Sequence, residues 1–375
     1  MVVRTSRRVP PGVRMLGRQV SRNCRDNRPL GGHARPVDPD LRIADVAQGD
    51  ESTLRAYWSV SAAARRLDEP LIPIQSFEEL LAEDDNQPSV RRHRWIAHDG
   101  DQPVGLILLE LPTLDNVDAA HATVEVHPHH RRRGIGGALL DVLLERVRAE
   151  RRSHVIGNVA EPLNGPPNAG AAFAASVGAT RALDEVCRAL EVNQLSFDGL
   201  AVQQAAAQTA AGGYELVQWL GPCPDELVDD LAVLTGRMST DAPMGDLAWE
   251  AESWDRERVR ESEARSTRLA RQWVTTAARE LATGHLVAYT DMGWSTRDPG
   301  TAFQWMTIVD ATHRGHRLGM LVKAANLRAL CREVPVVERV ITWNAESNTH
   351  MIAINEALGF RPRLRFSQWQ LQVPP

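Results

Sequence analysis

The feature that most constrains this chain is a strand, basic loop and helix pattern that occurs twice. The first copy reads VEVHPHHRRRGIGG from Val124 to Gly137, and the second reads TIVDATHRGHRLG from Thr307 to Gly319. In both copies the valine near the end of the strand stands equally far before the first matched arginine of the loop. A repeating unit of about 150 residues is too long for a solenoid, so two copies of one domain are expected.

Hydrophobic periodicity and turn residues predict a similar order of elements around each copy. Two domains with an α/β (α+β) fold are therefore expected, at residues 37–192 and 214–375, joined by a partly helical linker at 193–213. The predicted strands are 41–46, 94–98, 103–111, 121–127, 155–159, 182–192, 214–220, 271–278, 285–291, 303–309, 339–343 and 363–372. The predicted helices are 51–66, 76–82, 135–150, 169–177, 318–332 and 349–358, with further helical segments before residue 267.

Composition is that of a globular protein, with 43% hydrophobic and 24% charged residues. No apolar run is long enough for a membrane span. Residues 1–36 hold nine arginines and one acid, Asp26, and are expected to be a disordered extension. A transit-peptide-like segment, a start codon assigned too early, or a contact with an anionic surface are the alternatives.

Four scattered cysteines without a CxxC pair predict a reducing, cytoplasmic setting and no disulfide framework. Lys323 is the only lysine, and this preference for arginine suggests a G+C-rich bacterial genome. No spacing of His, Cys or Asp suggests a metal site.

A strand that feeds a loop at the start of a helix presents several unpaired backbone N–H groups, which suit a pyrophosphate. An ordinary strand-to-helix turn with a solvated basic patch is the alternative. The GxxxxGK[ST] motif is absent, and the glycine spacing differs from that of dinucleotide-binding folds. The predicted phosphate-binding residues are Arg131, Arg132, Arg133, Gly134, Ile135, Gly136 and Gly137, with Arg314, Gly315, His316, Arg317, Leu318 and Gly319.

These loops resemble the pyrophosphate loop of the GCN5-related N-acetyltransferase (GNAT) family, Gln/Arg-x-x-Gly-x-Gly/Ala. The first copy matches from Arg131 to Gly136, whereas Arg317 replaces the first glycine in the second. The family also has an asparagine before a helix that ends in Gly-Phe. Asn348 and Gly359-Phe360 fit this pattern, and Asn168 with Gly178-Ala179 fits it with the asparagine displaced by one residue.

The resemblance covers residues 40–192 and 214–373, and implies two tandem GNAT-like domains, each a mixed central sheet flanked by helices. The tandem arrangement is similar to that of actinobacterial two-domain members such as mycothiol synthase. The resemblance further implies that acetyl-CoA, the co-substrate, lies between strands 121–127 and 155–159, or between 303–309 and 339–343. A backbone N–H of the first strand would then bind the thioester oxygen, with Val126 and Val309 near the pantetheine arm.

The usual catalytic residues of the family are missing. Its glutamate base corresponds to Ala120 and Phe303, and its tyrosine acid corresponds to Ala174 and Asn355. Direct transfer by proximity remains possible, because a thiol of pKa about 8.5 can depart as thiolate without an acid.

Substitute bases are expected near the strand ends: Glu125, His127, Glu161, Asp291 and Glu346. Surface carboxylates or helix caps are the alternative for each. Glu125 has the side-chain parity opposite to that of the usual base, so we expect it to face away. Trp305, Thr307 and Trp343 of the second copy are the predicted acceptor pocket, with core packing as the alternative for the tryptophans. These residues favour the second copy as the catalytic one.

The expected function is acetyl transfer from acetyl-CoA directly to an amine of a small molecule, by a monomer or homodimer. A non-catalytic acyl-CoA sensor and a protein or peptide N-acetyltransferase are the alternatives. Neither a membrane nor a nucleic acid is an expected partner, and no metal is required.

Overall fold

The computed structural model describes residues 40–83 and 86–374, so the predicted extension at 1–36 lies outside the described residues. The strands are β1 (Leu41–Asp45), β2 (Asn86–Gln87), β3 (Val90–Asp99), β4 (Gln102–Pro112), β5 (Ala119–Val126), β6 (His154–Pro162), β7 (Thr180–Glu191), β8 (Tyr214–Leu220), β9 (Arg271–Glu280), β10 (Leu286–Ser295), β11 (Thr301–Val309), β12 (Arg339–Ala345) and β13 (Arg361–Gln372). The α-helices are α1 (Glu51–Asp68), α2 (Phe77–Leu81), α3 (Ile135–Ala149), α4 (Ala169–Ser176), α5 (Phe197–Ala210), α6 (Val228–Gly236), α7 (Met238–Asp241), α8 (Arg256–Arg268), α9 (Leu318–Glu333) and α10 (Thr349–Ala357).

Local capping explains why several helices begin and end where the sequence predicted. Ser76 and Glu79 form a reciprocal capping box at the start of α2. The asparagines Asn168 and Asn348 cap α4 and α10 through their side-chain oxygens. Because both asparagines cap the last helix of their copy, the displacement by one residue in the sequence does not change their structural position.

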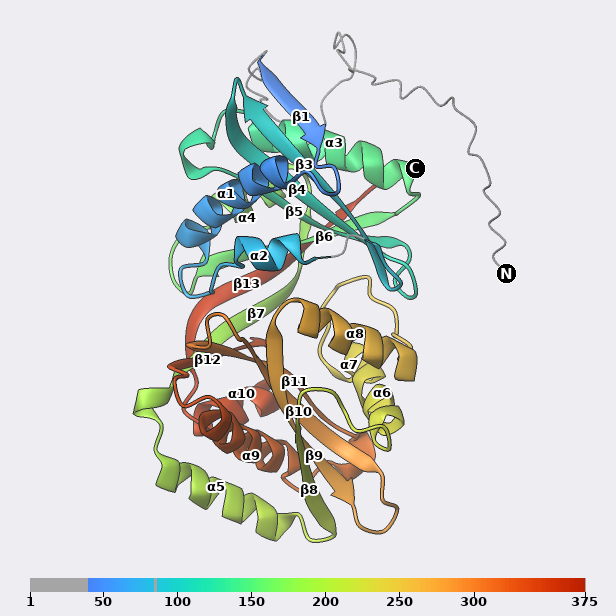
Figure 1. The fold of residues 1–375 in the computed structure, drawn as a ribbon, viewed down its shortest axis with the longest axis vertical. Helices are drawn as coiled ribbons and strands as arrows, with labels where there is room; N and C mark the ends of the chain where they lie inside the picture. Colours follow the sequence, from blue (N-terminus) through green and yellow to red (C-terminus); the bar gives the residue numbers. More distant parts are fainter. Residues whose placement is uncertain (1–39, 84–85, 375) are drawn as a thin grey trace, which may run out of the picture. The chain divides into compact units, whose positions relative to one another are not determined.

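The strands form one continuous mixed sheet, in the order β1-β3-β4-β5-β6-β13-β7-β12-β11-β10-β9-β8 (Figure 1). We call residues 40–192 the N-terminal half and residues 193–374 the C-terminal half. Strand β13 of the C-terminal half pairs antiparallel with β6 of the N-terminal half. Strand β7 of the N-terminal half pairs in turn with β12 and β13. Each half therefore completes its sheet with a strand from the other, which the sequence did not predict.

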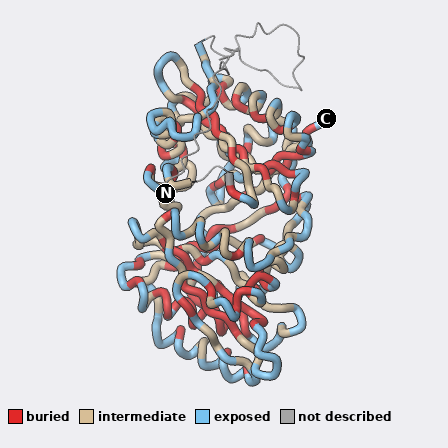
Figure 2. Tube along the Cα trace, turned by 45° about the vertical axis from the view of Figure 1, so that its right-hand side comes forward, coloured by how far each residue is buried: buried red, intermediate tan, exposed pale blue. Residues whose placement is uncertain are grey.

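Each half has its own apolar core, and the buried segments gather in both (Figure 2). In the N-terminal half, Leu139 and Leu143 of α3 pack in a core with Ile107 and Leu109 of β4. In the C-terminal half, most residues of α9 are buried, and they include a lysine, Lys323. The two cores carry the duplicated strand, loop and helix.

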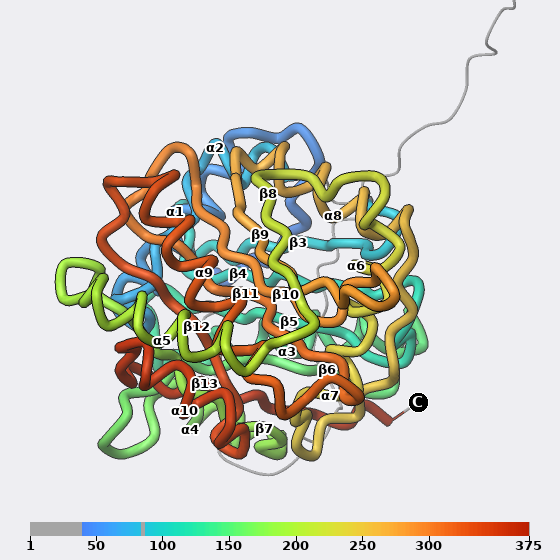
Figure 3. Tube along the Cα trace, turned by 90° about the horizontal axis from the view of Figure 1, so that it is seen from below, coloured from blue at the N-terminus to red at the C-terminus, as the bar shows by residue number. Residues whose placement is uncertain are grey.

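The segment predicted as a linker contains helix α5, which lies alongside α9 (Figure 3). Its Leu200 and Ala207 belong to the same buried cluster as the apolar residues of α9. The alanine-rich composition that weakened the periodic signal allows this close helix packing, so most of the segment belongs to the C-terminal core.

In the part of the chain that the structure describes, no helix has the length and apolar character that crossing a membrane would require.

Because β7 and β13 tie the two halves together, we expect one cooperative unfolding transition in urea. The replacement Leu139→Ala should lower the free energy of unfolding by about 2–5 kcal/mol and shift the whole transition. Circular dichroism and tryptophan fluorescence, followed on the same samples, should give coincident curves. Two resolved transitions, only one of them moved by Leu139→Ala, would contradict this coupling.

Candidate active site

A cleft opens between β5 and β6 because these parallel strands pair only from Ala119 to His121. The His127 amide donates to the Val104 carbonyl, which directs alternate residues of β5 toward β4. The backbone groups of Val124 and Val126 therefore point the other way, toward the diverging β6. The Val126 side chain packs against the core, so its backbone rather than its side chain faces the cleft.

The loop after β5 presents backbone N–H groups at the start of α3. Among the described residues, the amides of residues 132–136 have no hydrogen-bond acceptor. Arg132 and Gly134 both adopt the left-handed conformation, with φ of 66° and 84°. The glycine tolerates this geometry without strain, and the turn places the free amides at the positive end of the helix. This geometry fits an anion such as a pyrophosphate.

The first arginine of each loop has a structural partner. Arg131 donates to the Val126 carbonyl and makes a two-pronged pair with Asp68 at the end of α1. Arg314 donates to the Val309 carbonyl and pairs with Asp241 at the end of α7. Both residues were predicted to bind phosphate, and in the structure both connect the loop to its strand and to a neighbouring helix.

The second loop has the same geometry. The amides of residues 315–319 have no acceptor among the described residues, and Arg317 is left-handed with φ of 56°. The first loop combines Arg132 with Gly134, and the second combines Gly315, with φ of 90°, with Arg317 at the equivalent positions. Each loop therefore has one left-handed glycine and one left-handed arginine, which carries a backbone cost, so the replaced glycine does not change the path of the loop.

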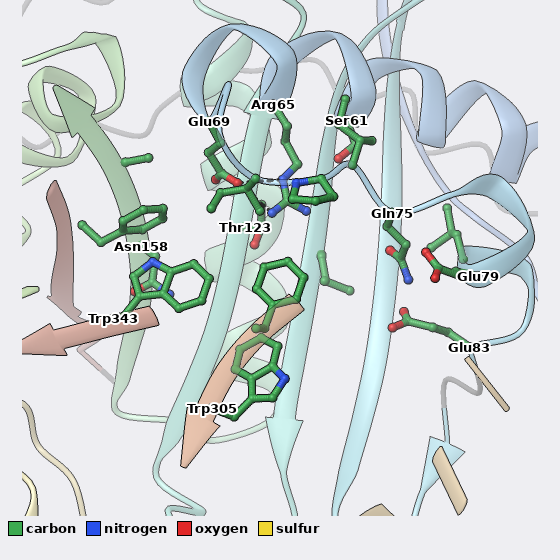
Figure 4. A pocket seen from close by; sticks show the side chains of 18 of the residues that line it. Ser61, Arg65, Glu69, Gln75, Glu79, Glu83, Thr123, Asn158, Trp305 and Trp343 are labelled. Carbon is green, nitrogen blue, oxygen red and sulfur yellow. Dashed lines mark hydrogen bonds and ion pairs between the residues drawn. The ribbon is translucent and has the colours of Figure 1, made fainter. Parts of the chain in front are cut away.

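The cleft of the N-terminal half opens into a cavity of about 1380 Å³ that residues of both halves line. Ser61 and Arg65 come from helix α1, Glu69 directly follows this helix, and Thr123 and Asn158 come from the cleft strands (Figure 4). Trp305 and Trp343 come from β11 and β12 of the C-terminal half (Figure 4). The Ser295 hydroxyl donates to Glu79 and Arg265 pairs with Glu83, which joins the halves at the edge of the cavity.

Glu125 lines this cavity, although its parity had suggested that it faces away. It belongs to the face of β5 that meets α1, and its Oε2 atom is buried without a hydrogen-bond partner. Burial raises the pKa of Glu125 to about 7, and the Ser61 hydroxyl and the Arg65 charge oppose this shift. A carboxylate with this pKa is half ionised near neutral pH, which suits a general base.

The corresponding cleft of the C-terminal half is filled with aromatic rings. Strands β11 and β12 also pair over three positions only and then diverge. The positions two residues after the last paired residues of each cleft are equivalent. In the first cleft they are Thr123 and Asn158, and in the second they are Trp305 and Trp343. The two indoles stack with centroids 5.8 Å apart and planes 13° apart. At the position of Glu125, one residue before the strand-ending valine, the second cleft has the buried Ile308.

The other predicted residues of the C-terminal half lie apart from one another. Asp291 is half-buried, lines the shared cavity and accepts the Met306 amide at 2.7 Å, and burial raises its pKa to about 6. Thr307 does not line the cavity, because its hydroxyl meets Thr290 and the Lys323 amine on the side of α9. Glu346 is exposed and pairs with Arg365.

Two remaining candidates also have other partners. Glu161 is buried and accepts from Ser367, with Arg181 beside it. His127 caps the short turn that follows β5. At the positions of the family's tyrosine, Ala174 lines the cavity and Asn355 is buried, donating to Asn344 at 2.6 Å.

Sequence reasoning missed Arg65, in the last turn of α1, and Glu69, which directly follows this helix; both charges act on Glu125. Arg65 donates to Glu69 through two nitrogens, at 3.0 and 2.7 Å. Their spacing of four residues is an ordinary helix-surface pair, so no local pattern distinguished them. Among the described residues, no group of His, Cys, Asp and Glu could hold a metal ion.

The model of the acetyltransferase (GNAT) family matches residues 58–165, which contain the first cleft and loop. A solved tandem GNAT protein from the clavulanic acid biosynthesis pathway is 31% identical, with a TM-score of 0.75 over 89% of this chain and 99% of that one. A GCN5-related N-acetyltransferase from Sphaerobacter thermophilus is 15% identical, with a TM-score of 0.63 over 91% of this chain and 98% of that one. No curated protein sequence matches the chain.

The raised pKa of Glu125 predicts a pH-dependent cost to stability. The folded state holds the proton up to about pH 7, whereas an unfolded glutamate releases it near pH 4.3. Wild-type stability should therefore fall as pH rises between these values. Glu125→Gln should gain about 1–3 kcal/mol at pH 8 relative to pH 4, as measured by urea unfolding at both pH values. The exposed Glu346→Gln is the control, and an equal response of both variants would count against a buried Glu125.

Proposed function

The chain belongs to the GNAT acetyltransferase family in its tandem form, and on this basis we propose that it transfers the acetyl group of acetyl-CoA directly to an amine of a small molecule, in the cleft of its N-terminal half. The observation that carries this proposal is Glu125, whose carboxylate lines the cavity and whose Oε2 atom is buried without a hydrogen-bond partner. The second cleft has no equivalent group, because Ile308 stands there. This reverses the preference for the second copy that the sequence favoured.

Binding of acetyl-CoA is supported by the loop of residues 132–136 and by the free strand edge of β5. The loop amides would hold the pyrophosphate, while the side chains of Arg132 and Arg133 extend from the same turn. The Val124 and Val126 amides would donate to the thioester oxygen. Their hydrogen bonds would strengthen as negative charge develops on that oxygen during attack.

Glu125 would remove a proton from the ammonium form of the acceptor, so that its nitrogen lone pair attacks the thioester carbon. A carbon–nitrogen bond forms, the carbon–sulfur bond breaks, and the thiolate of CoA leaves. A thiol with pKa about 8.5 is a good enough leaving group that no tyrosine is required. Arg65 would stabilise the ionised Glu125, since its charge opposes the rise in that pKa.

A small acceptor is supported by the position of the cleft. The cavity into which it opens is lined by α1, α2 and the C-terminal strands β11 and β12, so both halves enclose the acceptor side. A folded protein would have to enter between the halves, past the contacts between Glu79 and Ser295 and between Glu83 and Arg265.

Glu125→Gln should lower kcat by about 10²- to 10⁴-fold, the usual contribution of a positioned base. The wild-type value of kcat/KM should fall as pH drops through about 7, because protonated Glu125 cannot accept a proton. The variant should lack this inflection. Release of free thiol from acetyl-CoA, followed across an amine panel from pH 6 to 9, measures both effects.

Glu346→Gln is the matched control and should keep the wild-type profile, because Glu346 is exposed and lies outside the cavity. If acetyl-CoA binds but no amine in the panel releases thiol, the transferase proposal fails and an acyl-CoA-binding protein takes its place.

A further inference from the structure

Three aromatic side chains of the C-terminal half form what we call the aromatic floor: Phe303, Trp305 and Trp343. Their ring centroids are 5.2–6.0 Å apart and their planes are within 21° of parallel. Figure 4 shows the indoles of Trp305 and Trp343 side by side with their faces turned the same way. Nearly parallel neighbouring rings give the cavity a continuous flat surface.

The sequence and the backbone both make room for this floor. Phe303 and Trp305 are two residues apart on β11, so they share one face of the strand. Beside them on β10 is Gly293, whose added Cβ would lie 3.3 Å from the Trp305 indole nitrogen. A larger residue at position 293 would crowd the indole, so the glycine allows Trp305 to pack against the sheet.

The floor faces the N-terminal half. Leu71 and Ile72, from the connection between α1 and α2, pack in one cluster with Phe303 and Trp343. Trp305 nevertheless remains 51% exposed, although it is one of the largest side chains lining the cavity. A large ring left open inside a cavity is better explained by a ligand that covers it than by core packing.

The charge of the cavity selects the kind of ligand. Ten acidic residues line it against five arginines, and no lysine or histidine. Three of these arginines already pair with carboxylates: Arg65 with Glu69, and both Arg94 and Arg265 with Glu83. Two more acids of the lining pair with arginines outside it, Asp68 with Arg131 and Glu263 with Arg260. Burial raises the pKa of Glu185 and so disfavours its ionised form. The acids of the lining still outnumber the arginines, so the cavity favours cations over carboxylates.

We infer that the aromatic floor is the acceptor-recognition surface of the N-terminal cleft, and that the acceptor is a primary amine attached to a flat, aromatic body without an acidic group. The inference rests on the proposed function, since it names the acceptor class for that cleft. Aromatic faces attract both a stacked ring and a cationic nitrogen. The C-terminal half, which has Ile308 at the position of Glu125, thus contributes to the substrate site of the N-terminal half.

The test measures binding separately from turnover. Titration calorimetry on the full chain holding CoA uses 2-phenylethylamine, n-butylamine and phenylalanine as probes. These share an amine, but butylamine lacks the ring and phenylalanine adds a carboxylate. The wild-type protein should bind 2-phenylethylamine at least about ten-fold more tightly than either of the others.

Trp305→Ala should lower the affinity for 2-phenylethylamine about ten-fold. The same replacement should change the affinity for butylamine by less than two-fold. Trp305→Phe should restore most of the difference. The control is Phe197→Ala, an equally exposed aromatic residue on α5 that does not line this cavity. Acetyl-CoA affinity, measured in parallel, should be unchanged in all three variants.

Equal affinities for 2-phenylethylamine and butylamine, or a Trp305→Ala variant that binds like wild type, would overturn the inference. If 2-phenylethylamine binds in a way that depends on Trp305 but no thiol is released, the aromatic floor remains supported as a binding surface and the proposed acetyl transfer is refuted. If amines without a ring release thiol and 2-phenylethylamine does not, the proposed acetyl transfer remains supported and the role of the aromatic floor is refuted.

Discussion

The backbone pairing of β13 with β6, and of β7 with β12, is the interaction on which the rest of the structure depends. Each of these strands is an edge that its own half leaves unpaired, and the other half supplies the partner. Hydrogen bonds along a whole strand fix both distance and orientation, which contacts between separate domains seldom do. The clefts and helices of the two halves are therefore held in one arrangement, and a cavity with walls from both becomes a permanent feature.

This arrangement explains how the two copies could diverge. The first has open strand edges at Thr123 and Asn158, and Glu125 lines the same cavity. In the second, indoles occupy the two equivalent places, and Ile308 replaces the carboxylate. Because the second copy is held against the first, residues that close its own cleft can still line the shared cavity. We interpret the C-terminal half as a support and a substrate wall for the N-terminal half.

Much of the fold was predictable because the signals that define it are local. Alternating strands, helix caps such as Asn168 and Asn348, and the repeated basic loop are all read within a few residues. The strand exchange was not predictable, because β7 and β13 have the same alternation whichever half they pair with. For the site, the sequence predicted the two loops as phosphate-binding and Trp305 and Trp343 as an acceptor pocket, and these roles stay predictions. The sequence associated the two tryptophans with the cleft of the C-terminal half, whereas they line a cavity that both halves share. No local pattern could show that another half faces them.

The role of individual loop residues was harder to predict for the same reason. Arg131 and Arg314 have the charge that suits phosphate, but Asp68 and Asp241 reach them from distant helices. Burial raises the pKa of Glu125, and the distant helix α1 supplies Ser61 and Arg65, which oppose this rise. Charge and spacing thus indicated the kind of site, while burial by segments far away in the sequence decided which residues are free to act.

The central claim is that the first cleft alone carries out acetyl transfer, and a pair of matched glycine replacements tests it most directly. Gly136 and Gly319 occupy equivalent places in the two loops, and an added Cβ would lie 3.3 Å from Phe173 in one and 3.3 Å from Ile354 in the other. The measurement is the rate of thiol release from acetyl-CoA by Gly136→Val and Gly319→Val, with folding checked by circular dichroism. We predict that Gly136→Val loses activity at least about 100-fold and that Gly319→Val stays within a few-fold of wild type. The reverse order, or equal losses in two folded variants, would contradict the account.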